Sequence, residues 1–308
     1  MDVQNLIQQF NEGGKKALAR CITIVENELK GHEQILTTLQ PKNIPVIGIT
    51  GPPGAGKSTL INAVVNYLTK QNKKVGILAI DPTSPFNYGS LLGDRLRMAD
   101  HFTNENVFIR SLATRGALGG LSAKTIEICD VMRSFDFDYV FVETVGVGQS
   151  EVEIVGLADI TVLVLVPEAG DEVQTLKSGI MEIADVYVVN KADRDGANTF
   201  LSNLHHLVSS RIHQQSVPPL GGPQGGAPII KCIATRDEGV KELVDAIDTI
   251  HPAKSNSKKI HLLTEKVFHL IQNQRMKNVN KEKLHKLIDE EIKKGNFNLY
   301  TFAKKLSH

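Results

Sequence analysis

The sequence lacks the residues that mark several classes of protein. Its 308 residues include no tryptophan, and aromatic residues make up only 5% of the chain. The three cysteines, Cys21, Cys129 and Cys232, are odd in number and far apart, so they form no zinc-binding or redox motif. We therefore expect buried, apolar cysteines in a protein of a reducing compartment.

A strong charge and a long apolar run are absent as well. The formal net charge is +1, so the molecule as a whole is not an obvious binder of nucleic acid. No apolar run approaches the ~20 residues needed to span a bilayer, and residues 1–5 do not begin a basic and apolar leader. These absences predict a cytoplasmic, soluble protein with no membrane partner and no nucleic-acid partner.

The most informative segment is 51–58, which reads Gly-Pro-Pro-Gly-Ala-Gly-Lys-Ser and fits the phosphate-binding motif G-x-x-x-x-G-K-[ST]. A predicted strand precedes it and a predicted helix follows it. The glycines let backbone N–H groups surround phosphate oxygens, and the helix start adds donors and partial positive charge. We expect Lys57 to reach the β- and γ-phosphates and Ser58 to bind Mg²⁺. The residues expected around the nucleotide phosphates are Gly51, Pro53, Gly54, Ala55, Gly56, Lys57, Ser58 and Thr59.

Residues 42–250 alternate apolar strands with helical patterns. Several strands are continuous runs of Val, Ile and Leu, which indicates a mostly parallel sheet with helices on both faces. This pattern predicts the α/β fold of a P-loop NTPase, in which the ligand lies at the carboxyl ends of the strands. The predicted strands are residues 46–50, 75–80, 107–110, 139–143, 161–166, 186–190 and 229–233.

Helical segments flank this predicted domain. Residues 1–41 place apolar side chains on one broad face, with a break at Gly13 and Gly14. Residues 251–308 also have a helical pattern, and from residue 254 onward 13 Lys and Arg stand against 5 Asp and Glu, a difference of +8. This tail is interpreted as an oligomerisation arm, as a binder of anionic surfaces, or as a solvated helical hairpin.

Residues 190–193, Asn-Lys-Ala-Asp, match the guanine-reading motif N-K-x-D. A carboxylate at Asp193 can accept from the guanine N1–H and exocyclic amine together, and adenine has no such pair of donors. We expect Asn190 to brace the loop and the stem of Lys191 to lie over the base. The structural alternative for Asp193 is a helix cap.

Three acidic residues are candidates for the metal side of the site. Glu143 ends a predicted strand and suits contact with Mg²⁺ through a bound water, and Gly146 after it could donate its N–H to the γ-phosphate. Asp81 ends another strand and is a candidate for the Mg²⁺ side or for orienting water, and Asp94 is a second candidate in a predicted switch loop. With Ser58, these three acids form the expected Mg²⁺ site. The alternative is that each acid is an ordinary strand-end, cap or turn residue.

Further motifs accompany these in a fixed order. They include Asp-Pro-Thr-Ser-Pro at 81–85, Val-Glu-Thr-Val-Gly-Val-Gly-Gln-Ser-Glu at 142–151 and Ala-Gly-Asp-Glu at 169–172. Because of these motifs taken together, the chain resembles the MeaB/ArgK family, the GTPase chaperones of adenosylcobalamin-dependent methylmalonyl-CoA mutase. The resemblance runs from about residue 48 to residue 193.

The resemblance implies a Mg²⁺-dependent GTPase that hydrolyses GTP slowly alone and faster when docked to its mutase. It would gate the loading of adenosylcobalamin, which would lie on the partner, and help to eject damaged cofactor. Residues 168–178 would form a third switch, in which Lys177 would serve partner-stimulated hydrolysis; the alternative is a surface lysine. The backbone N–H of Ala234 would contact guanine, and residues 251–308 would form a homodimer.

The chain also departs from the family pattern. Glu168 stands where a glycine is usual, and Phe86, Asn87 and Tyr88 replace small residues. These changes leave open whether the partner acts on methylmalonyl-CoA, isobutyryl-CoA or another acyl-CoA, because a partner reads such switch segments. The alternative functions are a nickel-insertion GTPase, a small-molecule kinase, and a non-enzymatic module that binds through the basic tail.

Overall fold

The computed structural model describes most of the chain in two compact units, Met1–Leu263 and Thr264–His308. The predicted domain boundaries, at residues 41 and 250, stay predictions. The described residues are 2–81, 98, 101, 103–113, 123–144, 154, 156–169, 181, 184–214, 227–253, 263–264, 267–268, 270–272, 275–276, 279–295 and 297–306.

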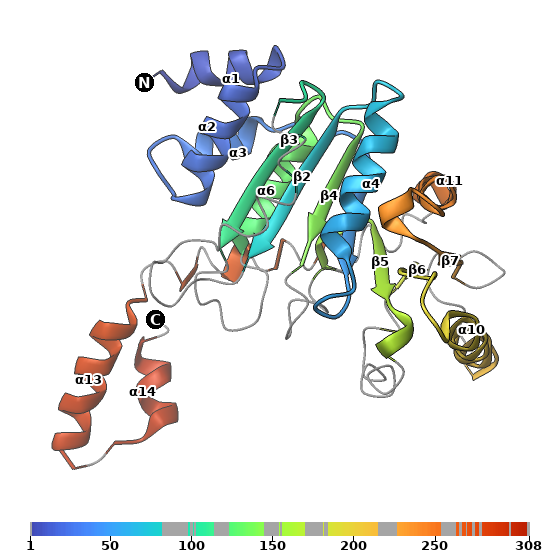
Figure 1. Cartoon of the computed structure of the whole chain (residues 1–308). Helices are drawn as coiled ribbons and strands as arrows, with labels where there is room; N and C mark the ends of the chain where they lie inside the picture. The colour runs from blue at the N-terminus through green and yellow to red at the C-terminus, as the bar shows by residue number, and fades with distance from the viewer. Residues whose placement is uncertain are drawn as a thin grey trace. The chain divides into compact units, whose positions relative to one another are not determined.

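A seven-stranded sheet forms the centre of the first unit (Figure 1). Its strand order is β3-β2-β4-β1-β5-β6-β7, and every pairing between these strands is parallel. The predicted fold class, an α/β P-loop NTPase with a parallel sheet, is confirmed. The strands are β1 (Val46–Thr50), β2 (Val75–Asp81), β3 (Val107–Ala113), β4 (Tyr139–Glu143), β5 (Ile160–Leu165), β6 (Val186–Val189) and β7 (Ile229–Lys231).

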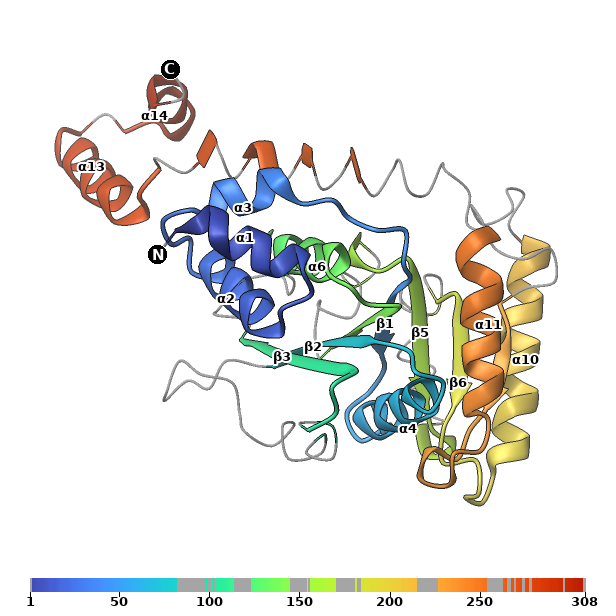
Figure 2. The same cartoon turned by 90° about the horizontal axis from the view of Figure 1, so that it is seen from above.

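Helices cover both faces of the sheet because successive side chains of a strand point to opposite faces. In β1, Ile47 and Ile49 pack with α4 and α11, whereas Val46 packs on the other face with α6. Figure 2 shows α4 and α6 on opposite sides of β2 and β3. The helices of this unit are α1 (Val3–Asn11), α2 (Lys15–Glu26), α3 (His32–Thr38), α4 (Lys57–Thr69), α6 (Ala123–Ser134), α10 (Ala197–Gln214) and α11 (Val240–Ala253).

The three N-terminal helices pack on the sheet unit rather than standing apart from it. Leu18 and Ile22 of α2 are fully buried in one cluster with side chains of α6, β2 and β4. The Lys15 ammonium reaches the amino end of β3, where it donates to the carbonyl of Val107 at 3.0 Å and to that of Asn104, just before the strand, at 3.3 Å. Burial lowers the pKa of Lys15. The N-terminal segment is therefore part of the hydrophobic core that supports the sheet.

The second unit contains α13 (Lys281–Lys293) and α14 (Leu299–Leu306). Phe297, just before α14, packs against Phe302 within it, with ring centroids 5.6 Å apart. Many of this unit's described apolar side chains are exposed, and so is that of Leu263, the last residue of the first unit. Those of the second unit are Val267, Phe268, Leu270, Ile271, Met276, Val279, Ile292, Leu299, Tyr300 and Leu306. Within the described part of the chain, no helix has both the length and the apolar character needed to cross a membrane.

Candidate functional site

The sheet register brings the predicted site residues to one edge. Ile49 of β1 pairs with Glu143 of β4, and Thr50 pairs with Leu163 of β5. The loop that follows β1 therefore leaves the sheet between the carboxyl ends of β4 and β5, where ligands bind in folds of this class. Thr144 fastens this point, because its N–H donates to the Ile49 carbonyl at 3.1 Å.

The loop after β1 requires glycine at two positions. Gly51 has φ +140°, and a Cβ there would lie 2.1 Å from the Val164 carbonyl oxygen. Gly56 has φ +85°, and its Cβ would lie 2.5 Å from Nδ2 of Asn190. A side chain at either position would push the backbone away from its neighbours. The glycines therefore allow a close approach that a phosphate-cradling loop needs.

Lys57 and Ser58 begin α4 directly after this loop. Among the described residues, no side chain caps the start of this helix, so its first N–H groups are suited to an anion. The Lys57 side chain is only 7% exposed, and its Nζ donates to the carbonyls of Gly51 at 2.8 Å and Pro52 at 3.2 Å. Its ammonium group is thus held over the loop, where phosphate oxygens could replace carbonyl oxygens.

Ser58 joins the loop to the end of β4. Its hydroxyl donates to Oε1 of Glu143 at 2.6 Å, and both side chains are buried. Hydroxyl and carboxylate oxygens are ligands that Mg²⁺ prefers, and Mg²⁺ sites in nucleotide enzymes take few protein ligands beside phosphates and waters. The pair Ser58 and Glu143 therefore fits such an ion.

Asn190, directly after β6, links three loops. Its side chain is 2% exposed; Nδ2 donates to the Ala55 carbonyl at 2.9 Å, and Oδ1 accepts from the N–H of Ala234 at 3.2 Å. Lys191 adopts φ +54°, and its Nζ donates to the Gly54 carbonyl at 2.7 Å. The N-K-x-D segment is thereby fastened to the phosphate-binding loop and to the turn η3 (Ala234–Arg236).

A cavity of about 160 Å³ opens between these loops. The Asp193 side chain beside it is 39% exposed, and its Oδ2 lies 3.7 Å from Nη2 of Arg236. A carboxylate at the rim of a small pocket above a phosphate-binding loop can read the edge of a bound base. The cavity is lined by Gly56, Thr59, Asn190, Lys191, Asp193, Arg194, Ile233, Ala234 and Thr235.

The remaining predicted residues divide into two groups. The backbone of Asp81 ends β2, two positions beyond Ala79, which pairs with Glu143. This register places Asp81 at the same edge of the sheet as the metal candidates. Asp94, Gly146 and Lys177 lie outside the described residues.

Three residues that lie at or beside the cavity of about 160 Å³ were not predicted from the sequence. Arg194 and Thr235 line it, and Arg236 pairs with Asp193. Arg194 follows the N-K-x-D motif directly, which was an available signal. Arg236 offered none, because only the folded sheet brings the turn after β7 beside the turn after β6.

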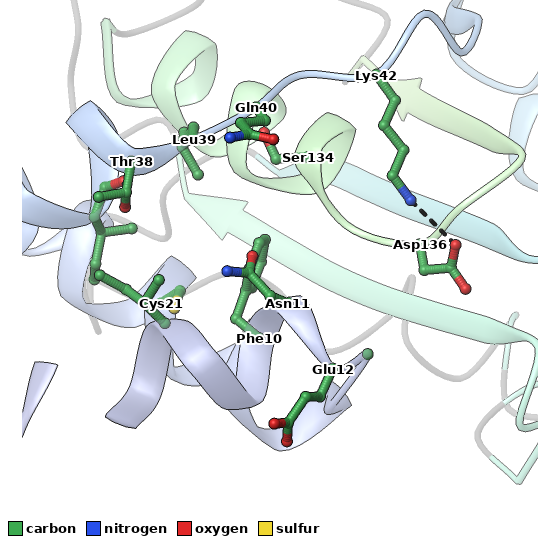
Figure 3. Close-up of a pocket in the computed structure, with 13 residues that line it drawn as sticks. Phe10, Asn11, Glu12, Cys21, Thr38, Leu39, Gln40, Lys42, Ser134 and Asp136 are labelled. Carbon is green, nitrogen blue, oxygen red and sulfur yellow. Dashed lines mark hydrogen bonds and ion pairs between the residues drawn. The ribbon is translucent and has the colours of Figure 1, made fainter. Parts of the chain in front are cut away.

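A larger cavity of about 530 Å³ lies between α1, α3 and α6 (Figure 3). Lys42 and Asp136 line it and pair at 3.1 Å, and they precede β1 and β4, so it lies at the amino ends of these strands. Burial raises the pKa of the Cys21 thiol in its wall to about 11, so this thiol is protonated at neutral pH and a poor nucleophile. The smaller cavity, not the larger one, adjoins the candidate chemical groups.

Comparison with known proteins decides the family. A family described as Methylmalonyl Co-A mutase-associated GTPase MeaB matches residues 18–292. The chain belongs to this MeaB family. The match begins within α2 of the first unit and ends within α13 of the second.

Relatives support the assignment of this MeaB-family chain as a GTPase. A Pyrococcus abyssi protein named as a GTPase is 43% identical over 296 residues, which cover 94% of this chain and 83% of the relative. The GTPase ArgK of Escherichia coli is 35% identical over 247 residues, or 78% and 73% of the two chains. The crystal structure of a LAO/AO transport system kinase matches with a TM-score of 0.67 at 25% identity, covering 99% and 96%. The predicted family and the predicted GTPase activity are confirmed.

Proposed function

We propose that this MeaB-family GTPase is a chaperone of an adenosylcobalamin-dependent acyl-CoA mutase, with methylmalonyl-CoA mutase as the first candidate. It would gate loading of adenosylcobalamin onto the mutase and protect or reactivate that enzyme. The observation that carries the proposal is the match over residues 18–292 to a family described by its association with methylmalonyl-CoA mutase. The cobalamin would be bound by the mutase.

The hydrolytic roles rest on the contacts around the phosphate-binding loop. Lys57 would bind the β- and γ-phosphates, since its buried ammonium is already held above the loop by carbonyl oxygens. Ser58 and Glu143 would hold Mg²⁺, and Asp81 and Asp94 would complete its surroundings. The ion would neutralise charge on the β- and γ-phosphate oxygens. Gly146 would donate its N–H to the γ-phosphate.

Guanine recognition would use the smaller cavity. Asp193 would accept from the guanine N1–H and exocyclic amine, while Lys191 would cover one face of the base. Asn190 holds the loop that carries both residues. The Ala234 N–H donates to Oδ1 of Asn190 at 3.2 Å, and it would also contact guanine.

The partner would act through residues 168–178, where Lys177 would approach the transferring phosphoryl group as an arginine finger does. Residues 251–308 would form a homodimer, and the exposed apolar side chains of the second unit support this role. We place the protein in the cytoplasm, since its three cysteines are buried and none of them forms a disulfide bond.

The proposal is tested by GTP hydrolysis with Mg²⁺, measured alone and with the adenosylcobalamin-dependent mutase of the same organism. ATP is the nucleotide control, and Lys57→Ala is the protein control. We expect slow turnover of GTP that rises sharply with the mutase and is lost in Lys57→Ala. A rate that no such mutase changes would contradict the chaperone role while leaving the GTPase intact.

A further inference from the structure

We propose that the ion pair between Glu168 and Arg194 positions the guanine-reading loop and links it to the turn that follows β5. This inference rests on the proposed role of Asp193 in reading guanine. It assigns a function to Arg194 and to η2 (Pro167–Ala169), the turn that contains Glu168. Glu168 and Arg194 are both positioning residues, because neither is required to touch the phosphates.

The contacts place this pair directly beside the base pocket. Nη1 of Arg194 donates to Oε1 of Glu168, and Arg194 lines the cavity next to Asp193. The hydrogen bond from Arg194 lowers the pKa of the Glu168 carboxyl, so the pair is charged at neutral pH. The pair therefore joins η2, the turn after β5, to the residue directly after the N-K-x-D motif.

The loop has a reason to need such a tie. Lys191 holds a left-handed conformation at φ +54°, which is unfavourable for a side chain of its size and persists only when its surroundings fix it. Asn190 and Lys191 fasten the amino end of the motif to the phosphate-binding loop. At the carboxyl end, the Glu168–Arg194 pair supplies the corresponding constraint, in addition to the longer contact between Asp193 and Arg236.

The size of the effect follows from exposure. The Arg194 and Glu168 side chains are 50% and 47% exposed, and pairs in such positions contribute little because water screens them. We expect loss of the pair to speed nucleotide dissociation about two- to five-fold. Since coupling between sites is reciprocal, a bound guanine nucleotide would in turn hold η2 in place.

The experiment measures dissociation of fluorescent GDP and IDP analogues from the full chain and from four variants. These are Glu168→Gln, Arg194→Gln, the two combined, and the exchanged pair Glu168→Arg with Arg194→Glu. Lys241→Gln is the matched control, because it removes an exposed ion pair to Asp245 within α11, and neither residue lines the cavity. Amide hydrogen exchange at η2, with and without GDP, is measured on the same proteins.

We expect each single variant to release GDP about two- to five-fold faster, the combined variant to be no faster than either single one, and the exchanged pair to restore much of the loss. IDP, which lacks the exocyclic amine, should be affected less than GDP. GDP should slow exchange at η2 in the unaltered chain and in Lys241→Gln, but not in Arg194→Gln.

Unchanged dissociation in both single variants, or effects that add in the combined variant, would overturn the proposal. Urea unfolding of each variant identifies a loss of folding, and Glu168→Gln tests the pair from a different element if Arg194→Gln proves unstable. If the unaltered chain retains GDP and IDP equally, the proposed reading of the exocyclic amine fails, whatever the variants show. The two failures are therefore distinguishable.

Discussion

Replacement of Asn190 by alanine tests how the site is held together. The change removes the donor to the Ala55 carbonyl and the acceptor for the Ala234 N–H. Ala55 is 0% exposed and Ala234 is 6% exposed, so water has poor access to the groups left behind. An unsatisfied buried polar group costs about 1–3 kcal/mol, which gives about 2–4 kcal/mol for the two after partial relaxation.

The assay is urea unfolding of the nucleotide-free protein, followed by titration with fluorescent GDP. We expect a loss of about 2–4 kcal/mol in the free energy of unfolding and at least about a tenfold weaker affinity for GDP. Asn198→Ala is the matched control, because Asn198 is exposed on α10, where its Oδ1 accepts a hydrogen bond from Nζ of Lys231 at 3.1 Å. A stability within about 0.5 kcal/mol of the unaltered chain would refute the bracing role of Asn190.

Two further predictions concern the phosphate-binding loop and the Cys21 thiol. Gly56→Ala should lower the free energy of unfolding by about 1–3 kcal/mol and abolish GDP binding, because the added Cβ would meet Nδ2 of Asn190. Gly54→Ala, whose Cβ would meet no described atom within 4 Å, should lower it by about 1 kcal/mol. Equal losses of stability in urea unfolding would contradict this reasoning. Burial raises the pKa of Cys21 from 9.0 to about 11, so the unfolded chain releases a proton that the folded chain keeps, and stability should fall as pH rises from 9 toward 11. A stability that is flat or rising over that window, compared with Cys21→Ala, would argue against a buried thiol.

Much of the sheet was predictable because its strands are buried on both faces. Every residue of β1 and of β4 is buried, and most of these residues are apolar, so the bounds of both strands agree with the prediction. At β7 the predicted strand extended to residue 233, but the observed strand ends at Lys231, and Ile233 instead forms an antiparallel bridge with Glu238. Local apolar character cannot show where hydrogen bonding to a neighbouring strand stops.

The candidate site was predictable in its parts rather than in its connections. Lys57, Ser58 and Asn190 carry recognisable motifs, and the carboxyl ends of parallel strands meet at one edge. The contact between Ser58 and Glu143 spans 85 residues of sequence, and the contact between Asn190 and Ala55 spans 135. Such pairs depend on the order of strands in the sheet, which a single sequence does not specify.

The most direct test of the central claim, that these loops form one guanine-nucleotide site, is the nucleotide preference of Asp193→Asn. The amide would lose one acceptor for the guanine donors, but it could donate to the O2 carbonyl of xanthine and still accept from N1–H. We predict that titration shows GDP affinity falling by about 10²-fold or more while XDP affinity rises. Retention of GDP binding with no gain for XDP would contradict the account.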